Sequence, residues 1–231
     1  MGKSVLKISE RQVRPLVFAA SFVFLCLAVL YFAPVKIPHK ISFPLATLTV
    51  AGLWLLPWEM CLAMFFSFLG DYAGSCSSFI MQMLFFALAH AWMIFFFVRR
   101  YLAKVEHDRK LTGKAKGYMI MVLLCAGVLL AVALTKVAPC APAGIIRTGV
   151  CIYATMICAM MVTALMQRSS LYALGAVLFV FSDFILAWNR FVEPIPGQRY
   201  LIMVPYYLGQ WLLFVRSTPY RIRNQVKLMR F

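Results

Sequence analysis

Two aspartates lie where a carboxylate is energetically expensive. Asp71 is in the run MFFSFLGDYAG and Asp183 is in the run GAVLFVFSDFILAW, and both runs are otherwise almost wholly apolar. An ionisable side chain in hydrocarbon costs at least ~2.5–3.5 kcal/mol on insertion scales, so it is usually paired and functional. Two close carboxylates tend to share one proton. We therefore expect Asp71 and Asp183 to carry acid–base chemistry.

The composition is that of a membrane protein. Of the 231 residues, 64% are hydrophobic and only 13% are charged, whereas a soluble domain averages about 45–50% apolar and roughly 25% charged residues. The apolar runs leave no room for a soluble domain. We expect an all-α, polytopic membrane protein with one transmembrane domain over 1–231, which includes a basic N-terminal segment (1–14) and a basic tail (217–231).

About eight apolar segments are candidates for transmembrane helices, since each span needs ~20 predominantly apolar residues. Proline, glycine and serine mark the breaks between them. The second and third segments are short and nearly continuous, so they could form one kinked hairpin. The expected spans are 15–33, 42–57, 59–75, 79–98, 117–135, 145–166, 170–190 and 199–216.

The positive charge indicates orientation in a membrane. The formal net charge is +16, which in a soluble protein would suggest a nucleic-acid partner. Here the basic residues lie in the connections between apolar runs, and 17 of the 23 fall on the side that holds both termini. By the positive-inside rule, that side is the cytoplasm. We expect membrane lipid as a partner and no nucleic acid.

Other polar side chains lie at the depth of the two aspartates. With a rise of 1.5 Å per residue, Asp71 and Asp183 are ~18 and ~20 Å from the inner ends of their spans, and His90 and Gln210 are each ~16 Å from the outer side. In a hydrocarbon core ~30 Å thick, these four side chains could meet. The remaining strongly polar residues in the spans are Ser67, Gln82, Ser182, Tyr206 and Tyr207.

Helical periodicity puts some of these side chains on common faces. Tyr206 and Gln210 share one face, and Arg190 lies one to two turns outward of Asp183 on another. A guanidinium at that level is suited to bind a phosphate, but it could equally be an arginine that snorkels to the interface. A lone intramembrane His or Gln can likewise serve only as a helix–helix hydrogen bond, worth ~0.6 kcal/mol on average.

The two halves of the chain resemble each other weakly. FFSFLGD in the third expected span is similar to LFVFSD in the seventh, and a span with a mid-membrane polar residue follows each. Four spans in each half would keep both halves in the same orientation. We predict a parallel four-plus-four repeat about an axis normal to the membrane, which would bring Asp71 and Asp183 face to face.

The seventh expected span also carries a longer pattern. Residues 175–191 read GAVLFVFSDFILAWNRF, which resembles the signature G-A-x-L-F-x-x-S-D-x-x-L-A-x-N-R-F of the YhhN family, the lysoplasmalogenases. Weaker matches follow the family order over about residues 43–216. They are SFLGD at 67–71, FALAH at 86–90, Tyr153 with Met160 and Met161, and YYLGQ at 206–210.

Three positions depart from the family pattern. Phe43 stands where the family usually has Lys before Pro-Leu, Met93 replaces a common Tyr, and Gly209 replaces a small Ala. The missing lysine leaves a possible substrate contact unfilled. The headgroup preference is therefore open.

The resemblance implies hydrolysis of the vinyl ether of lysoplasmalogens, alkenyl-glycerophosphocholine or alkenyl-glycerophosphoethanolamine, to a fatty aldehyde and a glycerophospho-base. Asp71 and Asp183 would be the acid–base pair, with the assignment between them open, and no metal or other cofactor is required. We expect an integral protein of the bacterial inner membrane with a lysophospholipid as substrate. The supporting residues would be Ser67, His90, Ser182, Asn189, Arg190, Tyr206, Tyr207 and Gln210.

Two other function classes fit the same residues. Intramembrane carboxylates can relay protons, so a proton-coupled transporter is one alternative. A membrane protein that binds lysolipid without turnover is the other. Cleavage of a lysoplasmalogen but not of its saturated ether analogue would separate hydrolysis from both.

Overall fold

The protein is an all-helical bundle in the computed structural model, which describes the backbone of residues 10–107 and 113–228 and the side chains of residues 13–103 and 117–218. Eight α-helices make up this part of the chain. They are α1 (Glu10–Phe32), α2 (Phe43–Leu55), α3 (Trp58–Ser75), α4 (Phe79–His107), α5 (Gly113–Val132), α6 (Ile145–Leu165), α7 (Ser170–Phe191) and α8 (Gln198–Leu228).

Each helix begins within five residues of the start of an expected span, and α4 and α8 continue well past the ends expected for them, residues 98 and 216. Pro57 separates α2 from α3, and the structure has two distinct helices there. Five of the helices are long and apolar enough to cross a membrane: α1, α4, α5 with the short helical turns after it, α6 and α7. α2 is apolar but shorter. The all-helical fold is therefore confirmed, and the number of spans stays a prediction.

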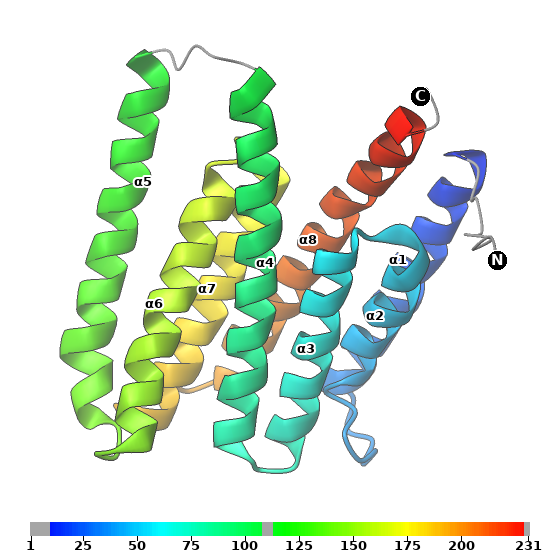
Figure 1. Ribbon diagram of the computed structural model, residues 1–231. Coiled ribbons are helices and arrows are strands. Elements are labelled where there is room, and N and C mark those ends of the chain that lie inside the picture. The colour runs from blue at the N-terminus through cyan, green and yellow to red at the C-terminus, as the bar shows by residue number, and fades with distance from the viewer. Residues whose placement is uncertain (1–9, 108–112, 229–231) are drawn as a thin grey trace.

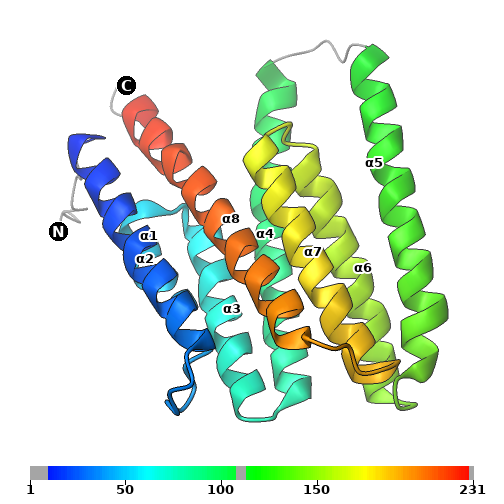
Figure 2. The same ribbon diagram turned by 180° about the vertical axis from the view of Figure 1, so that it is seen from behind.

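The helices run up and down, with most connections short (Figures 1 and 2). α1 begins and α8 ends at the same end of the bundle, where α4 also ends and α5 begins. The connections α1–α2, α3–α4 and α7–α8 lie at the opposite end, which we call the mouth end. Large apolar side chains such as Phe18, Leu124 and Val128 are exposed on the outside, where they would face lipid.

Two antiparallel pairs, α3 with α4 and α7 with α8, form the most extensive helix contacts. α4 also packs on α6, and α8 packs on α2. A four-plus-four repeat would relate α4 to α8 and α6 to α2. The contact between α4 and α6 would then correspond to the contact between α8 and α2. The contacts of α8 with α1 and α3 have no counterpart of similar extent between α4 and α5 or α7 in the described residues, so the four-plus-four repeat stays a prediction.

Two glycines let α7 and α8 approach closely. A Cβ built on Gly209 would lie 2.8 Å from the main-chain oxygen of Gly175, and a Cβ on Gly175 would lie 3.1 Å from the oxygen of Gly209. Small residues at a crossing allow this backbone contact, which is typical of helix pairs in membranes. Ser182 adds a link between the same helices, because its hydroxyl donates to the carbonyl of Ile202 at 2.9 Å.

Polar contacts tie the helix ends together. At the mouth end, Lys40 donates to the carbonyl oxygens of Ala33 and Val35 at 2.7 and 2.8 Å, beyond the C-terminus of α1. At the other end, Glu59 on α3 is fully buried and pairs with Arg99 on α4 at 2.5 Å. After α5 the chain makes a π-helical turn (Ala133–Val137) and a short 3₁₀ turn (Ala138–Cys140) before α6.

Candidate active site

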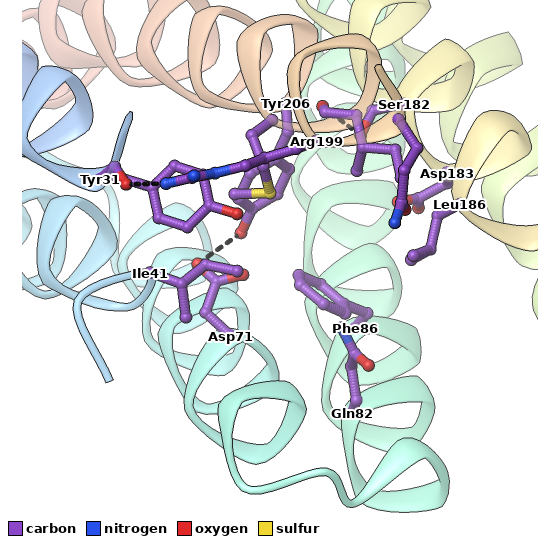
Figure 3. A pocket seen from close by; sticks show the side chains of 13 residues that line it. Tyr31, Ile41, Asp71, Gln82, Phe86, Ser182, Asp183, Leu186, Arg199 and Tyr206 are labelled. Carbon is purple, nitrogen blue, oxygen red and sulfur yellow. Dashed lines mark hydrogen bonds between the residues drawn. The ribbon is translucent and has the colours of Figure 1, made fainter. Parts of the chain in front are cut away.

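A cavity of about 330 Å³ opens among α1, α3, α4, α7 and α8 (Figure 3). Asp71 and Asp183 both line it, as the expected depths of the two side chains suggested. The rim is at the mouth end, where the first turn of α8 and the α1–α2 connection contribute side chains. The lining residues are Tyr31, Ile41, Asp71, Gln82, Phe86, Ser182, Asp183, Leu186, Gln198, Arg199, Ile202, Met203 and Tyr206.

Asp71 is held from α8. Its side chain is only 2% exposed, and the Tyr206 hydroxyl donates to its Oδ2 at 3.0 Å. Phe86 packs edge to face on the Tyr206 ring, with centroids 5.9 Å apart. A Cβ on Gly70 would come within 3.0 Å of the Phe86 ring. The glycine that precedes Asp71 therefore leaves room for the aromatic ring that supports its partner.

Asp183 is held from α4 and α6. The Tyr153 hydroxyl donates to Asp183 Oδ2, and His90 Nε2 lies 3.2 Å from the Tyr153 oxygen and 3.5 Å from the same carboxylate oxygen. A tyrosine has one hydroxyl proton, which here goes to Asp183, so towards His90 the oxygen can only accept. In this arrangement His90 Nε2 donates to the Tyr153 oxygen, and the three side chains form a chain of hydrogen bonds that ends on Asp183.

A contact to each carboxylate crosses between the halves of the chain. Asp71, on α3, receives its hydrogen bond from Tyr206 on α8. Asp183, on α7, is in contact with His90 on α4. Asp183 also accepts from Tyr153 on α6, within its own half, so the hydrogen bond that crosses between the halves is that of Asp71.

Ser67 and Gln210 pair with each other rather than with a carboxylate. Gln210 Nε2 donates to the Ser67 hydroxyl at 3.0 Å, and both side chains are fully buried. Each lies one helical turn from a cavity residue, Asp71 on α3 and Tyr206 on α8. This hydrogen bond fixes the relative position of α3 and α8 next to the cavity.

Six of the eight expected supporting residues lie outside the cavity lining: Ser67, His90 and Gln210, described above, and Tyr207, Asn189 and Arg190. The Tyr207 hydroxyl donates to the carbonyl of Ile41 at 2.8 Å. Asn189 donates to Gln198 at 2.8 Å and accepts from the Ile195 amide at 2.8 Å, so it organises the α7–α8 connection. Arg190 is exposed and stacks on the Phe79 ring, with its guanidinium carbon 4.1 Å from the centroid.

Sequence reasoning left Tyr153 and Arg199 out of the expected site. Tyr153 lies in the middle of an apolar span, where a hydroxyl needs a partner, and this signal was available. Arg199 was counted only as a connection charge. It is seven residues before Tyr206, so the face shared by Tyr206 and Gln210 extends through Met203 to Arg199.

Two further cavities of about 50 Å³ each also reach Asp183. Tyr153, Val150 and Ala187 line both of them, and the other lining residues are almost all apolar. One extends towards α5 and the π-helical turn, and the other towards α4. Asp183 thus borders the larger cavity, which polar and apolar side chains line together, on one side and almost wholly apolar space on the other.

Acidic, histidine and cysteine side chains do not form a cluster suited to a metal ion: within residues 13–103 and 117–218, whose side chains are described, no three of them gather closely enough. The side chains that converge on the cavity instead offer two carboxylates, several hydroxyl and amide groups and one guanidinium. This set is suited to proton transfer and to binding an anion.

Comparison with known families agrees with the pattern in the seventh span. A model of the YhhN family matches residues 13–217. This chain belongs to the YhhN family. The match includes both aspartates and every residue that lines the cavity, and it confirms the resemblance seen in residues 175–191. Apolar helices and membership of the YhhN family together mark the chain as a membrane protein.

Curated proteins similar to this chain carry the name lysoplasmalogenase TMEM86B. The human protein is 32% identical over 97 residues, a segment that is 42% of this chain and 40% of the human chain. The pig and rat proteins are 49% and 54% identical over 39 residues, 17% of each chain. The matched segments therefore span less than half of these relatives. No solved structure matches the chain.

Proposed function

We propose that this YhhN protein hydrolyses the vinyl ether of lysoplasmalogens, with Asp71 and Asp183 as its acid–base pair. The observation that carries the proposal is that these two intramembrane carboxylates, from helices α3 and α7, line a single cavity. The name lysoplasmalogenase, carried by relatives similar over part of the chain, supports the choice of substrate.

The proposed reaction begins with proton transfer to the β carbon of the vinyl ether. The proton comes from a carboxylic acid, and the carbon–carbon double bond supplies the electron pair, which leaves an oxocarbenium ion at the α carbon. A second carboxylate accepts a proton from water as the water oxygen attacks that carbon. The hemiacetal then breaks its bond to the glycerol oxygen, which takes up a proton, and a fatty aldehyde and a glycerophospho-base are released.

The hydrogen bonds favour different roles for the two aspartates. Asp183 accepts from the Tyr153 hydroxyl, whose oxygen is itself hydrogen-bonded to His90 Nε2, and a hydroxyl polarised in this way stabilises an ionised carboxylate. Asp71 faces one neutral hydroxyl, that of Tyr206. We propose that Asp71 donates the proton and that Asp183 orients the water and stabilises the cation. The division of labour is analogous to that of carboxylate-pair glycosidases.

We also propose that the chain crosses the membrane eight times with both termini in the cytoplasm. The mouth end of the bundle would then face away from the cytoplasm, and a headgroup would enter the cavity from that side. The apolar space beside Asp183, between α4, α6 and α7, would receive the first carbons of the alkenyl chain. The scissile bond would lie where polar and apolar space meet.

The test compares two lipids that differ only in the double bond. Purified protein in detergent or liposomes is incubated with a lysoplasmalogen and with its saturated 1-O-alkyl analogue, and the products are measured by mass spectrometry. We expect aldehyde and glycerophospho-base from the first lipid and no reaction of the second. Proton-coupled flux in proteoliposomes without hydrolysis would instead support a transporter.

The tyrosines that bind the carboxylates give a finer prediction. Tyr153→Phe and Tyr206→Phe each remove one hydroxyl and leave the ring packing intact. A hydrogen bond to a charged group is worth ~1.5–3 kcal/mol, so we expect kcat to fall at least ~10-fold in Tyr153→Phe and less in Tyr206→Phe. Steady-state kinetics on the lysoplasmalogen measure both. Equal activity of Tyr153→Phe and wild type would contradict the role given to Asp183.

A further inference from the structure

Arg199 supplies the positive charge of the cavity. Among the described lining residues it is the one Lys or Arg, and it lies exposed at the rim in the first turn of α8. Figure 3 shows its side chain extending across the cavity to Tyr31. A guanidinium nitrogen donates to the main-chain carbonyl of Tyr31, and the group stacks over the rings of Tyr31 and Phe32, at 4.7 and 5.7 Å from their centroids.

This guanidinium has donors to spare. No carboxylate in the described part of the chain forms an ion pair with Arg199. The ion pairs found there join His90 to Asp183 and Arg99 to Glu59. A guanidinium carries five N–H groups in a planar fork, and the carbonyl of Tyr31 accepts from one nitrogen only. The remaining donors are suited to a phosphate, which arginine binds through two parallel hydrogen bonds.

The spacing along α8 fits a glycerophospholipid. Arg199 and Tyr206 are seven residues apart on one face, so they are separated by ~10 Å along the helix axis. Tyr206 donates to Asp71. In a lysoplasmalogen, six bonds join the phosphorus to the first carbon of the vinyl ether, a contour of ~9 Å at ~1.5 Å per bond. A phosphate at Arg199 would therefore put the vinyl ether at the level of the carboxylates.

The size of the cavity supports the same arrangement. Ligand pockets for drug-sized molecules measure ~300–1,000 Å³, and this cavity, at about 330 Å³, is at the lower end. It has room for a headgroup and glycerol but not for a long chain as well. Arg190, in contrast, stacks on Phe79 and does not line the cavity.

We propose that Arg199 binds the phosphodiester of the lysophospholipid and thereby selects phosphate-bearing vinyl ethers over neutral ones. This inference rests on the proposed hydrolysis, and it names the group that holds the substrate's headgroup. The competing role is structural: Arg199 could serve only to fix the C-terminal end of α1, where a cation is favourable. A neutral substrate separates the two roles, because it lacks the phosphate but needs the same fold.

The experiment uses the full chain and two substrates, a lysoplasmalogen and the corresponding 1-O-alkenylglycerol. In Arg199→Gln we expect KM for the lysoplasmalogen to rise at least ~10-fold, the loss expected for a charge-assisted hydrogen bond. With alkenylglycerol we expect the kinetics of wild type within about two-fold. Arg199→Lys, which keeps the charge but not the planar fork, should lie in between. Lys36→Gln is the control, because Lys36 is exposed in the α1–α2 connection and is not a lining residue.

A binding measurement tests the phosphate contact of Arg199 without any catalytic step. The saturated 1-O-alkyl lysophospholipid and 1-O-alkylglycerol are titrated into wild type and Arg199→Gln. Binding of the phospholipid analogue that weakens at least ~10-fold in the variant, with unchanged binding of the alkylglycerol, supports the inference even if no lipid is cleaved. Equal losses for phosphate-bearing and neutral ligands, or no loss for either, would overturn it and leave the proposed hydrolysis standing if wild type cleaves.

Discussion

Asp71→Asn and Asp183→Asn are each expected to abolish aldehyde release from a lysoplasmalogen while the protein still inserts and folds. The amide keeps the shape of the side chain but can neither donate an acidic proton nor accept one. A positioned general acid or base contributes about 10²–10⁴-fold to a rate, so we expect at least a ~100-fold loss in each variant. Aldehyde is measured by mass spectrometry, and folding is measured by size-exclusion chromatography in detergent.

A matched control is available in the α7–α8 connection. Glu193→Gln makes the same acid-to-amide change at an exposed residue that does not line the cavity. We expect it to keep the activity of wild type. Full activity in Asp71→Asn or in Asp183→Asn would end the acid–base pair hypothesis, whatever the other variant does.

Gly209→Val is expected to separate α7 from α8 and to remove both stability and activity. A Cβ at this position would lie 2.8 Å from the oxygen of Gly175 and 3.2 Å from the amide nitrogen of Phe179, and both atoms belong to the main chain. No side-chain rotation can relieve such contacts, so a helix must move. Overpacking typically costs about 1–3 kcal/mol. The movement would also displace Tyr206 from Asp71.

The measurements are the midpoint of thermal unfolding in detergent and the rate of aldehyde release. Gly127→Val on α5 is the control, because a Cβ at Gly127 meets no atom within 4 Å. We expect the control to unfold near the temperature of wild type. Gly209→Ala should be the milder variant, since it adds one methyl group. A Gly209→Val protein as stable and active as wild type would contradict the close crossing.

Local sequence was sufficient to predict the helices. Pro57 breaks the chain between α2 and α3, and Pro194, Pro196 and Gly197 separate α7 from α8, so apolar runs bounded by such residues match the observed elements. Depth along each helix also followed from the sequence, because the rise per residue is fixed. This is why Asp71 and Asp183 could be expected at one level before their shared cavity was known.

Which helices are neighbours was harder to predict. Periodicity identifies the face of a helix but not the helix that packs against it. The hydrogen bond from Tyr153 to Asp183 joins α6 to α7, and the bond from Gln210 to Ser67 joins α8 to α3. These pairs depend on packing in three dimensions. Arg190 and Arg199 illustrate the limit, because both flank the same connection and only Arg199 lines the cavity.

The crosswise binding of Asp71 has a consequence for how the chain enters the membrane during synthesis. Tyr206 follows Asp71 by 135 residues, so α3 is made long before the hydroxyl that will bind its carboxylate. During that interval α3 carries an unpaired acid costing ~2.5–3.5 kcal/mol in hydrocarbon, and it is not among the five described helices that are long and apolar enough to cross a membrane. We expect α3 to wait at the insertion machinery until α4 emerges, and the two helices to enter the bilayer as one hairpin.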